Sequence, residues 1–96
     1  MKTIDLSKYS PIISDKGIGE EIYNTIKKGL ESNETLTVDM TGIRSMATFC
    51  AKQIFGKLYL EIGANSFFER LILKNASNDL KAIIKVGIQN AIEDIN

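Results

Sequence analysis

The residues that offer chemistry in this sequence gather between Asp39 and Lys52. Asp39 lies near the end of a stretch in which polar and apolar residues alternate, and the hydroxyl of Thr48 lies where an amphipathic helical pattern begins. The unpaired N–H groups and the positive dipole end of a helix start favour an oxygen ligand or an anion. Thr48, or Ser45 before it, therefore lies at the N-terminus of this helix, and capping is the ordinary role of a hydroxyl there.

Other kinds of reactive site find little support in the sequence. It contains no histidine and only one cysteine, Cys50. Histidine is the commonest metal ligand and the commonest proton shuttle at neutral pH, so metal hydrolases and histidine-based triads are excluded. At about 100° per residue, Cys50 lies off the apolar stripe of its helix, with no histidine or second cysteine to activate it. We expect no catalytic residue, no metal and no cofactor.

Length and charge narrow the function classes further. The 96 residues make one domain, 1–96, and 12 basic and 12 acidic residues give a net charge of zero. No global field therefore attracts nucleic acid or an anionic membrane. The first ten residues lack a continuous apolar segment, and no run approaches the roughly 20 apolar residues that span a bilayer. We expect a cytoplasmic protein that binds neither nucleic acid nor membrane.

Two neighbouring patterns position the candidate site. From Thr35 to Met40 apolar and polar residues alternate, which predicts a strand that Gly42 ends. From Thr48 the period changes to that of a helix, which Gly63 is expected to end. The apolar stripe of this helix consists of Ala51, Ile54, Phe55, Leu58 and Ile62.

The flanking segments complete an alternating order. A strand over Thr3–Leu6, continued by Ile12 and Ile13, precedes a helix that Ser14 caps and Ser32-Asn33 ends. After a link at Ala64–Ser66, a strand over Phe68–Lys74 leads to a final helix capped by Ser77 or Asn78. Gly87, within the apolar stripe of that helix, indicates close packing against the sheet. The order β-α-β-α-β-α predicts an α/β fold: a small single-domain sandwich of a mixed, largely parallel sheet with helices.

The stretch Val38-Asp39-Met40-Thr41-Gly42-Ile43, followed after Arg44-Ser45-Met46 by a small polar helix start, resembles the signature of STAS domains, the fold of bacterial anti-sigma-factor antagonists. The similarity is closer to the poorly characterised STAS-like branch and extends over nearly the full length. Further matches are Ser14-Asp15 with Gly17, Phe55-Gly56-Lys57-Leu58, and Leu73-Lys74-Asn75.

The resemblance implies a role for the start of the central helix. In the antagonists this helix begins with an Asp-Ser or Asp-Thr pair, whose hydroxyl a partner kinase phosphorylates to switch binding. Thr48 falls on the hydroxyl position, Ala47 on the aspartate, and Cys50 on a usual glycine. The resemblance therefore implies a GHKL-type ATPase or anti-sigma-like regulator as partner, with Thr48 as candidate phosphoacceptor. Asp39 and Gly42 are the loop-positioning residues; alternatively, Asp39 is a functional carboxylate at the strand end.

The outer face of the central helix offers a candidate contact surface. Phe49, Gly56 and Leu60 fall together on the side away from the apolar stripe, with Lys52 beside them. This strip either binds a partner, with Gly56 permitting close approach, or is covered by a neighbouring helix. The favoured function is a non-enzymatic interaction module of the STAS type. The alternatives are a constitutive assembly or homodimerisation module and, less favoured, a small-ligand-binding protein.

Overall fold

The computed structural model describes residues 2–95 and contains two parallel sheets. The larger sheet has the order β1 (Lys2–Asp5), β3 (Leu36–Asp39), β5 (Leu71–Lys74), and the smaller pairs β2 (Ile12–Ile13) with β4 (Ser45–Met46). The predicted α/β fold with a largely parallel sheet is confirmed. Ile12 and Ile13, however, do not continue the first strand. The 3₁₀ turn η1 (Ser7–Tyr9) separates them from β1.

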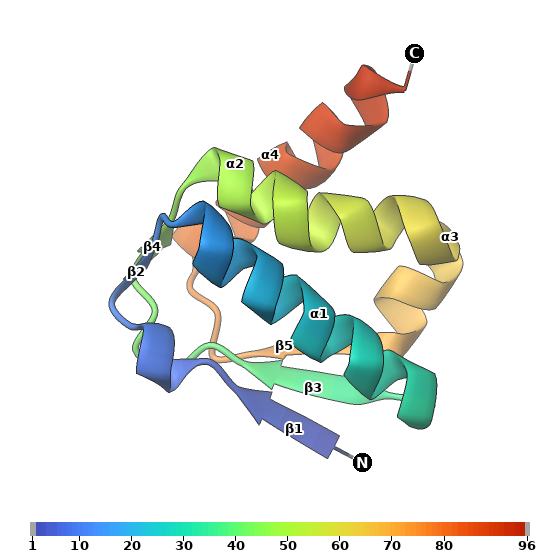
Figure 1. Cartoon of the computed structure of the whole chain (residues 1–96), viewed down its shortest axis with the longest axis horizontal. Coiled ribbons are helices and arrows are strands. Elements are labelled where there is room, and N and C mark those ends of the chain that lie inside the picture. The colour runs from blue at the N-terminus through green and yellow to red at the C-terminus, as the bar shows by residue number, and fades with distance from the viewer. Residues whose placement is uncertain (1, 96) are drawn as a thin grey trace.

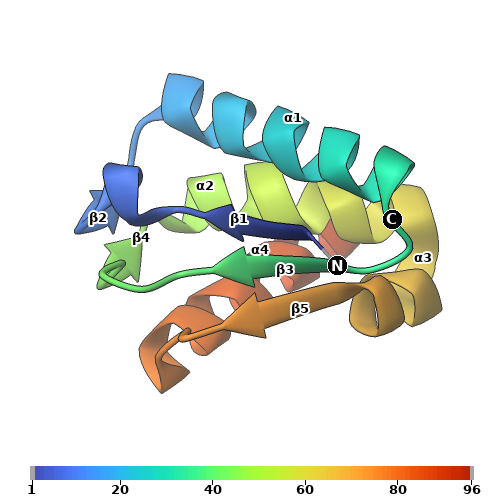
Figure 2. The ribbon, with the colours of Figure 1, turned by 90° about the horizontal axis from the view of Figure 1, so that it is seen from below.

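The helices lie together on one face of the larger sheet, as Figure 1 and Figure 2 show. They are α1 (Lys16–Ser32), the α2–η2–α3 run and α4 (Asn78–Asp94). The strands follow one another across the sheet in chain order, so each crossover moves in the same direction. Because crossovers between parallel strands are right-handed, crossovers in one direction place their helices on one side. The architecture is therefore a two-layer α/β sandwich.

Asp15, rather than the predicted Ser14, caps α1. Its carboxylate accepts a hydrogen bond from the Ile18 N–H (3.0 Å). The capping side chain must belong to the residue immediately before the first helical turn, and that residue is Asp15. Ser77 caps α4 as predicted, accepting from the Leu80 N–H (3.1 Å).

The central helix, residues 48–62, is continuous but not uniform. It comprises α2 (Thr48–Ala51), the π-helical segment η2 (Lys52–Gly56) and the first part of α3 (Lys57–Arg70). Gly63, with φ of 84°, breaks α3, as the sequence predicts. Residues 64–70 then form a second helical piece, so the predicted link at Ala64–Ser66 and the predicted strand start at Phe68 are wrong. The strand begins at Leu71.

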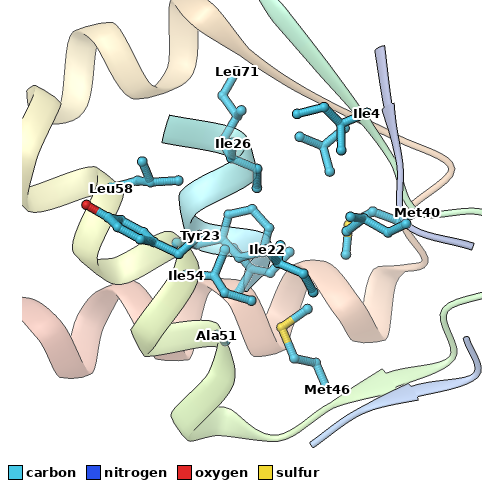
Figure 3. Close-up of a cluster of buried hydrophobic side chains, with 14 of the residues drawn as sticks. Ile4, Ile22, Tyr23, Ile26, Met40, Met46, Ala51, Ile54, Leu58 and Leu71 are labelled. Atoms are coloured by element: carbon cyan, nitrogen blue, oxygen red, sulfur yellow. The ribbon is translucent and has the colours of Figure 1, made fainter. Parts of the chain in front are cut away.

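The core lies between α1, the central helix and the inner face of the sheet (Figure 3). Every residue of the predicted central stripe is buried except Ile62, which is partly buried. The close-up labels Ile4, Ile22, Tyr23, Ile26, Met40, Met46, Ala51, Ile54, Leu58 and Leu71. The Tyr23 hydroxyl lies at the edge of this cluster and donates a hydrogen bond to Glu61.

Both α1 and α4 pack against the central helix, so more of this helix is buried than its apolar stripe predicts. Cys50, predicted off the stripe, is fully buried, and its thiol lies 3.6 Å from the Asp15 carbonyl oxygen at the start of α1. On the other side, Gly87 of α4 packs against the backbone of Ala51 and Lys52. The predicted close packing at Gly87 is therefore real, but its neighbour is the central helix and not the sheet. None of the helices within residues 2–95 is long and apolar enough to cross a membrane.

Candidate functional site

The start of the central helix leaves the Thr48 hydroxyl accessible. Ala47 is the N-cap residue, and its own N–H donates to the Ile13 carbonyl (2.8 Å), which fixes the helix start against β2. Thr48 is the first helical residue, is exposed, and forms no side-chain hydrogen bond within residues 2–95. The predicted cap at Thr48 is therefore wrong, and Ser45 lies in β4 rather than at the helix. A cap must precede the first turn, and that place belongs to Ala47.

A groove runs along the outer side of the central helix and is called here the helix groove. It is open, has a volume of about 390 Å³, and lies between the central helix and the end of α4. Three large apolar side chains are exposed in it: Phe49 (53%), Leu60 (40%) and Ile95 (67%). Its other lining residues are Lys52, Gln53, Lys57, Ala91 and Asp94.

Three of the four residues predicted to bind a partner therefore meet in one groove: Phe49, Lys52 and Leu60. Gly56 does not, because α4 covers it: a Cβ there would lie 2.8 Å from the Ala91 Cβ. Its lack of a side chain lets the chain's own α4 approach rather than an outside partner. At Gly56 the alternative of a covering helix is the one that the structure shows.

Sequence reasoning missed the part of the groove that α4 supplies. Ala91, Asp94 and Ile95 reach it by tertiary packing, and the carboxylate of Asp94 forms an ion pair with Lys52. Gln53 and Lys57, by contrast, follow Phe49 at intervals of four and were detectable as one helix face. The ion pair is largely exposed, so we expect it to add little stability.

Gln53 links the helix groove to the start of α1. Its side-chain amide donates to the Lys16 carbonyl (2.9 Å), while its carbonyl oxygen is buried against Gly19 without a hydrogen-bond partner. A side chain on Gly19 would collide with this amide, since a Cβ would lie 2.1 Å from the oxygen. Gln53 belongs to the π-helical segment, a geometry that occurs often at functional sites.

Asp39 lies at the carboxyl end of β3, where it holds the following turn. Its carboxylate accepts hydrogen bonds from the Thr41 hydroxyl (2.6 Å), the Thr41 N–H (3.0 Å) and the Asn75 amide (3.1 Å). These donors lower the pKa of Asp39, the Thr41 hydroxyl most, then Asn75. Gly42 follows with φ of 85°, a conformation that favours glycine. All three hydrogen bonds serve loop geometry, and none reaches Thr48.

The Cys50 thiol and the acidic side chains are the remaining candidates for reactive chemistry. Burial raises the pKa of the Cys50 thiol, which disfavours the reactive thiolate. Within the described part of the chain, no three Cys, Asp or Glu side chains gather in a way that would hold a metal ion. The candidate site described here therefore consists of the exposed Thr48 hydroxyl and the helix groove beside it.

Comparison with known families agrees with the fold. The sequence matches the family described as "STAS-like domain of unknown function (DUF4325)" over residues 19–81. That range runs from the first turn of α1 through the central helix and β5 into the first turn of α4. Neither the curated proteins nor the solved structures gave a match. With the matched range covering more than half of its length, the chain belongs to the STAS-like domain family.

Proposed function

We propose that this chain is a non-enzymatic interaction module that binds a protein partner through the helix groove. The observation that supports this proposal most strongly is the gathering of exposed apolar side chains there. Phe49 and Leu60 lie on the same helix as Lys52 and Lys57, so apolar anchors are flanked by charges. Aromatic anchors inside a polar rim are the usual composition of protein interfaces.

Burial of these anchors would supply a useful part of a binding free energy. Fully burying a Leu or Phe side chain contributes about 1.5–3 kcal/mol, and Phe49 and Leu60 are about half exposed before binding. We therefore expect roughly 1 kcal/mol from each. Gln53 and Lys57 can add hydrogen bonds at the rim.

The STAS resemblance suggests the identity of the partner and a switch. We propose a GHKL-type ATPase or anti-sigma-like regulator as partner, with phosphorylation of Thr48 as the switch. A phosphate there would add about −1.5 to −2 charges at a helix start, where N–H groups favour an anion. It would also compete with Asp94 for the ammonium group of Lys52, four residues along the helix. The fold would tolerate this charge, while an interface centred on Phe49 would not.

One observation favours a constitutive version of the same module. Ala47 stands where the antagonists carry an aspartate, and it caps the helix without any side-chain hydrogen bond. The second candidate function is therefore assembly with a partner, or with another copy, without phosphorylation. Both candidates use the helix groove, and they differ only in the role of Thr48.

The groove is tested by a charge placed at its exposed apolar wall. We expect Leu60→Asp to leave the circular dichroism spectrum unchanged while weakening the affinity for the partner isolated from the native cell. Val86→Asp is the matched control, because Val86 is 47% exposed on a helix and lies outside the groove. Equal affinities for Leu60→Asp and wild type would remove the helix groove as the binding surface. Loss of fold in Leu60→Asp would show that Leu60 belongs to the core.

The switch is tested separately at Thr48. If phosphorylation regulates binding, Thr48→Glu weakens the affinity, Thr48→Ala retains it, and the intact mass of the protein from its native host shows a phosphorylated fraction. If the module is constitutive, both folded variants bind as wild type does and no phosphorylated species occurs. Leu60→Asp weakens binding in either case, so failure of the switch and failure of the groove are distinguishable.

A further inference from the structure

A second groove follows the outer edge of the larger sheet and is called here the edge groove. Its volume is about 200 Å³, and the residues that line it come from the end of α3, from β5 and from residues 81–88 of α4. They are Phe67, Phe68, Leu71, Leu73, Lys81, Ile84, Lys85 and Ile88. The lining is therefore apolar apart from two lysines, and it includes no acidic residue.

The strand beside this groove is open to pairing. β5 pairs with β3 and is the last strand in the order β1-β3-β5. Edge strands offer unpaired backbone groups, and proteins usually protect them with charges, proline or bulges. The opposite edge, β1, carries Lys2 and Asp5, whereas β5 reads Leu-Ile-Leu before its single charge at Lys74. β5 is therefore the less protected of the two edges.

The side chains of β5 define what an added strand would meet. Leu71 and Leu73 face the helix layer and line the groove, while Ile72 is 41% exposed on the other face. A fourth strand beside β5 would turn every second side chain toward Ile84 and Ile88 of α4. Binding by strand addition combines backbone pairing with pockets for alternate side chains.

The two ends of the edge groove differ in chemistry. Phe67 and Phe68 precede the amino end of β5 and form an edge-to-face pair, with centroids 5.3 Å apart. Phe68 is 70% exposed. α4 begins beyond the carboxyl end of β5, as Figure 2 shows, and brings Lys81 and Lys85 to that side. Neither lysine forms an ion pair within residues 2–95.

We propose that the edge groove binds an extended, acidic segment of a partner protein that adds a strand to β5. Apolar side chains at alternate positions of the segment occupy the groove, and Asp or Glu side chains meet Lys81 and Lys85. Charge complementarity is the reason for proposing an acidic segment. The two lysines lie beside apolar side chains and form no ion pair within residues 2–95, so they attract an acidic segment and repel a basic one. The site is separate from the helix groove and does not depend on its function.

The first experiment selects the ligand without assuming its sequence. Random eight-residue peptides displayed on phage are panned against the folded full chain and against the variant Lys81→Glu/Lys85→Glu. We expect the wild type to enrich peptides that alternate apolar residues and carry Asp or Glu, and the variant to lose them. No enrichment, or enrichment of basic peptides, would overturn the proposal.

The second experiment measures the best selected peptide by fluorescence polarisation. We expect Lys81→Glu/Lys85→Glu to weaken its affinity about tenfold or more, because like charges then face each other, and added salt to weaken wild-type binding. Lys16→Glu/Lys28→Glu is the charge-matched control on α1, and Leu60→Asp is the control in the helix groove; both should bind as wild type does. If Lys16→Glu/Lys28→Glu weakened the affinity as much as Lys81→Glu/Lys85→Glu does, net charge alone would explain the effect and the proposed site would be wrong.

Strand addition itself is tested through the peptide backbone. N-methylation of alternate residues removes either the N–H groups that pair with β5 or those that point away. We expect one of the two methylated peptides to lose binding and the other to retain it, whereas equal binding by both peptides would overturn strand addition.

The remaining possible occupant of the edge groove is a second copy of the chain. Size-exclusion chromatography of the protein without peptide tests this possibility. A wild-type dimer that Lys81→Glu/Lys85→Glu converts to monomer would make the occupant a second copy and overturn the proposal.

Discussion

Replacement of Gly87 by alanine tests how closely α4 packs against the central helix. A Cβ at this position would lie 2.6 Å from both the Ala51 carbonyl carbon and the Lys52 nitrogen. Gly→Ala inside a helix by itself stabilises by up to about 1 kcal/mol. Overpacking costs about 1–3 kcal/mol, and the upper end applies because the obstacle is backbone rather than a side chain that can rotate. We therefore expect Gly87→Ala to lower the free energy of unfolding by about 2 kcal/mol.

Gly19→Ala is the matched comparison, because its obstacle is a flexible side chain. The new methyl group would displace the Gln53 amide and break its hydrogen bond to Lys16, at a cost of about 1 kcal/mol. The gain in helix propensity is similar, so the net change should be near zero. Urea unfolding followed by circular dichroism measures both variants, and Gly87→Ala should also melt roughly 8–16 °C lower than wild type. A Gly87→Ala protein as stable as Gly19→Ala would refute the reasoning.

Three further predictions concern the core, a helix end and the β3 turn. Ile54→Ala should cost about 2–5 kcal/mol in urea unfolding, because Ile54 is fully buried; an unchanged stability would contradict the assigned helix phase. Arg70→Ala should cost about 2 kcal/mol, since its guanidinium donates to three backbone carbonyls at the end of α1, those of Leu30, Asn33 and Glu34. An unchanged free energy of unfolding for Arg70→Ala would mean that water replaces those donors. The lowered pKa of Asp39 means that its ionised form stabilises the fold above its ordinary pKa of 3.8, and that this contribution is lost as the pH falls through the lower folded value. The stability of Asp39→Asn should therefore fall less steeply than that of the wild type as the pH is lowered through this range. Superimposable stability–pH profiles of the two proteins would exclude a contribution from ionised Asp39.

Periodicity predicted the elements whose stability rests on one buried face. The spacing of Ile22, Ile26 and Leu30 placed α1, and the alternation around Val38 placed the middle strand. It failed for β4, because Ser45 and Met46 form a strand only by pairing with Ile12 and Ile13. A two-residue strand has no period of its own, so its partner is the only signal.

The helical piece after Gly63 shows how tertiary contacts override a local pattern. Phe68 follows Phe67 and stands before an apolar run, so the sequence predicts that a strand begins at Phe68. In the structure both rings pack edge-to-face with Tyr59, across the turn at Gly63, and Phe67 is buried. The aromatic contact favours a helical turn there, and a single sequence does not reveal which distant ring will supply it.

The candidate site was predictable from the central helix but not from α4. A helical wheel orders the residues of one helix, so it placed Phe49, Lys52 and Leu60 on a common side. A wheel of one helix does not include neighbouring helices, so it placed Cys50 away from the buried side and left open whether a partner or a neighbouring helix covers Gly56. Asp94 and Ile95 lie more than thirty residues from Leu60 in sequence. Only the packing of α4 brings them to the groove.

The packing of α4 against the central helix also determines whether a ligand in one groove changes the affinity of the other. The middle turns of α4 supply Ile84 and Ile88 to the edge groove, and its last turns supply Ala91 and Asp94 to the helix groove. A ligand in one groove affects the other only if it favours a different position of α4. The contact at Gly87 leaves no room for a small displacement toward the central helix, because backbone atoms already meet there. We therefore expect the two grooves to bind their ligands independently, with the same affinity for the edge-groove peptide whether or not the helix groove is occupied.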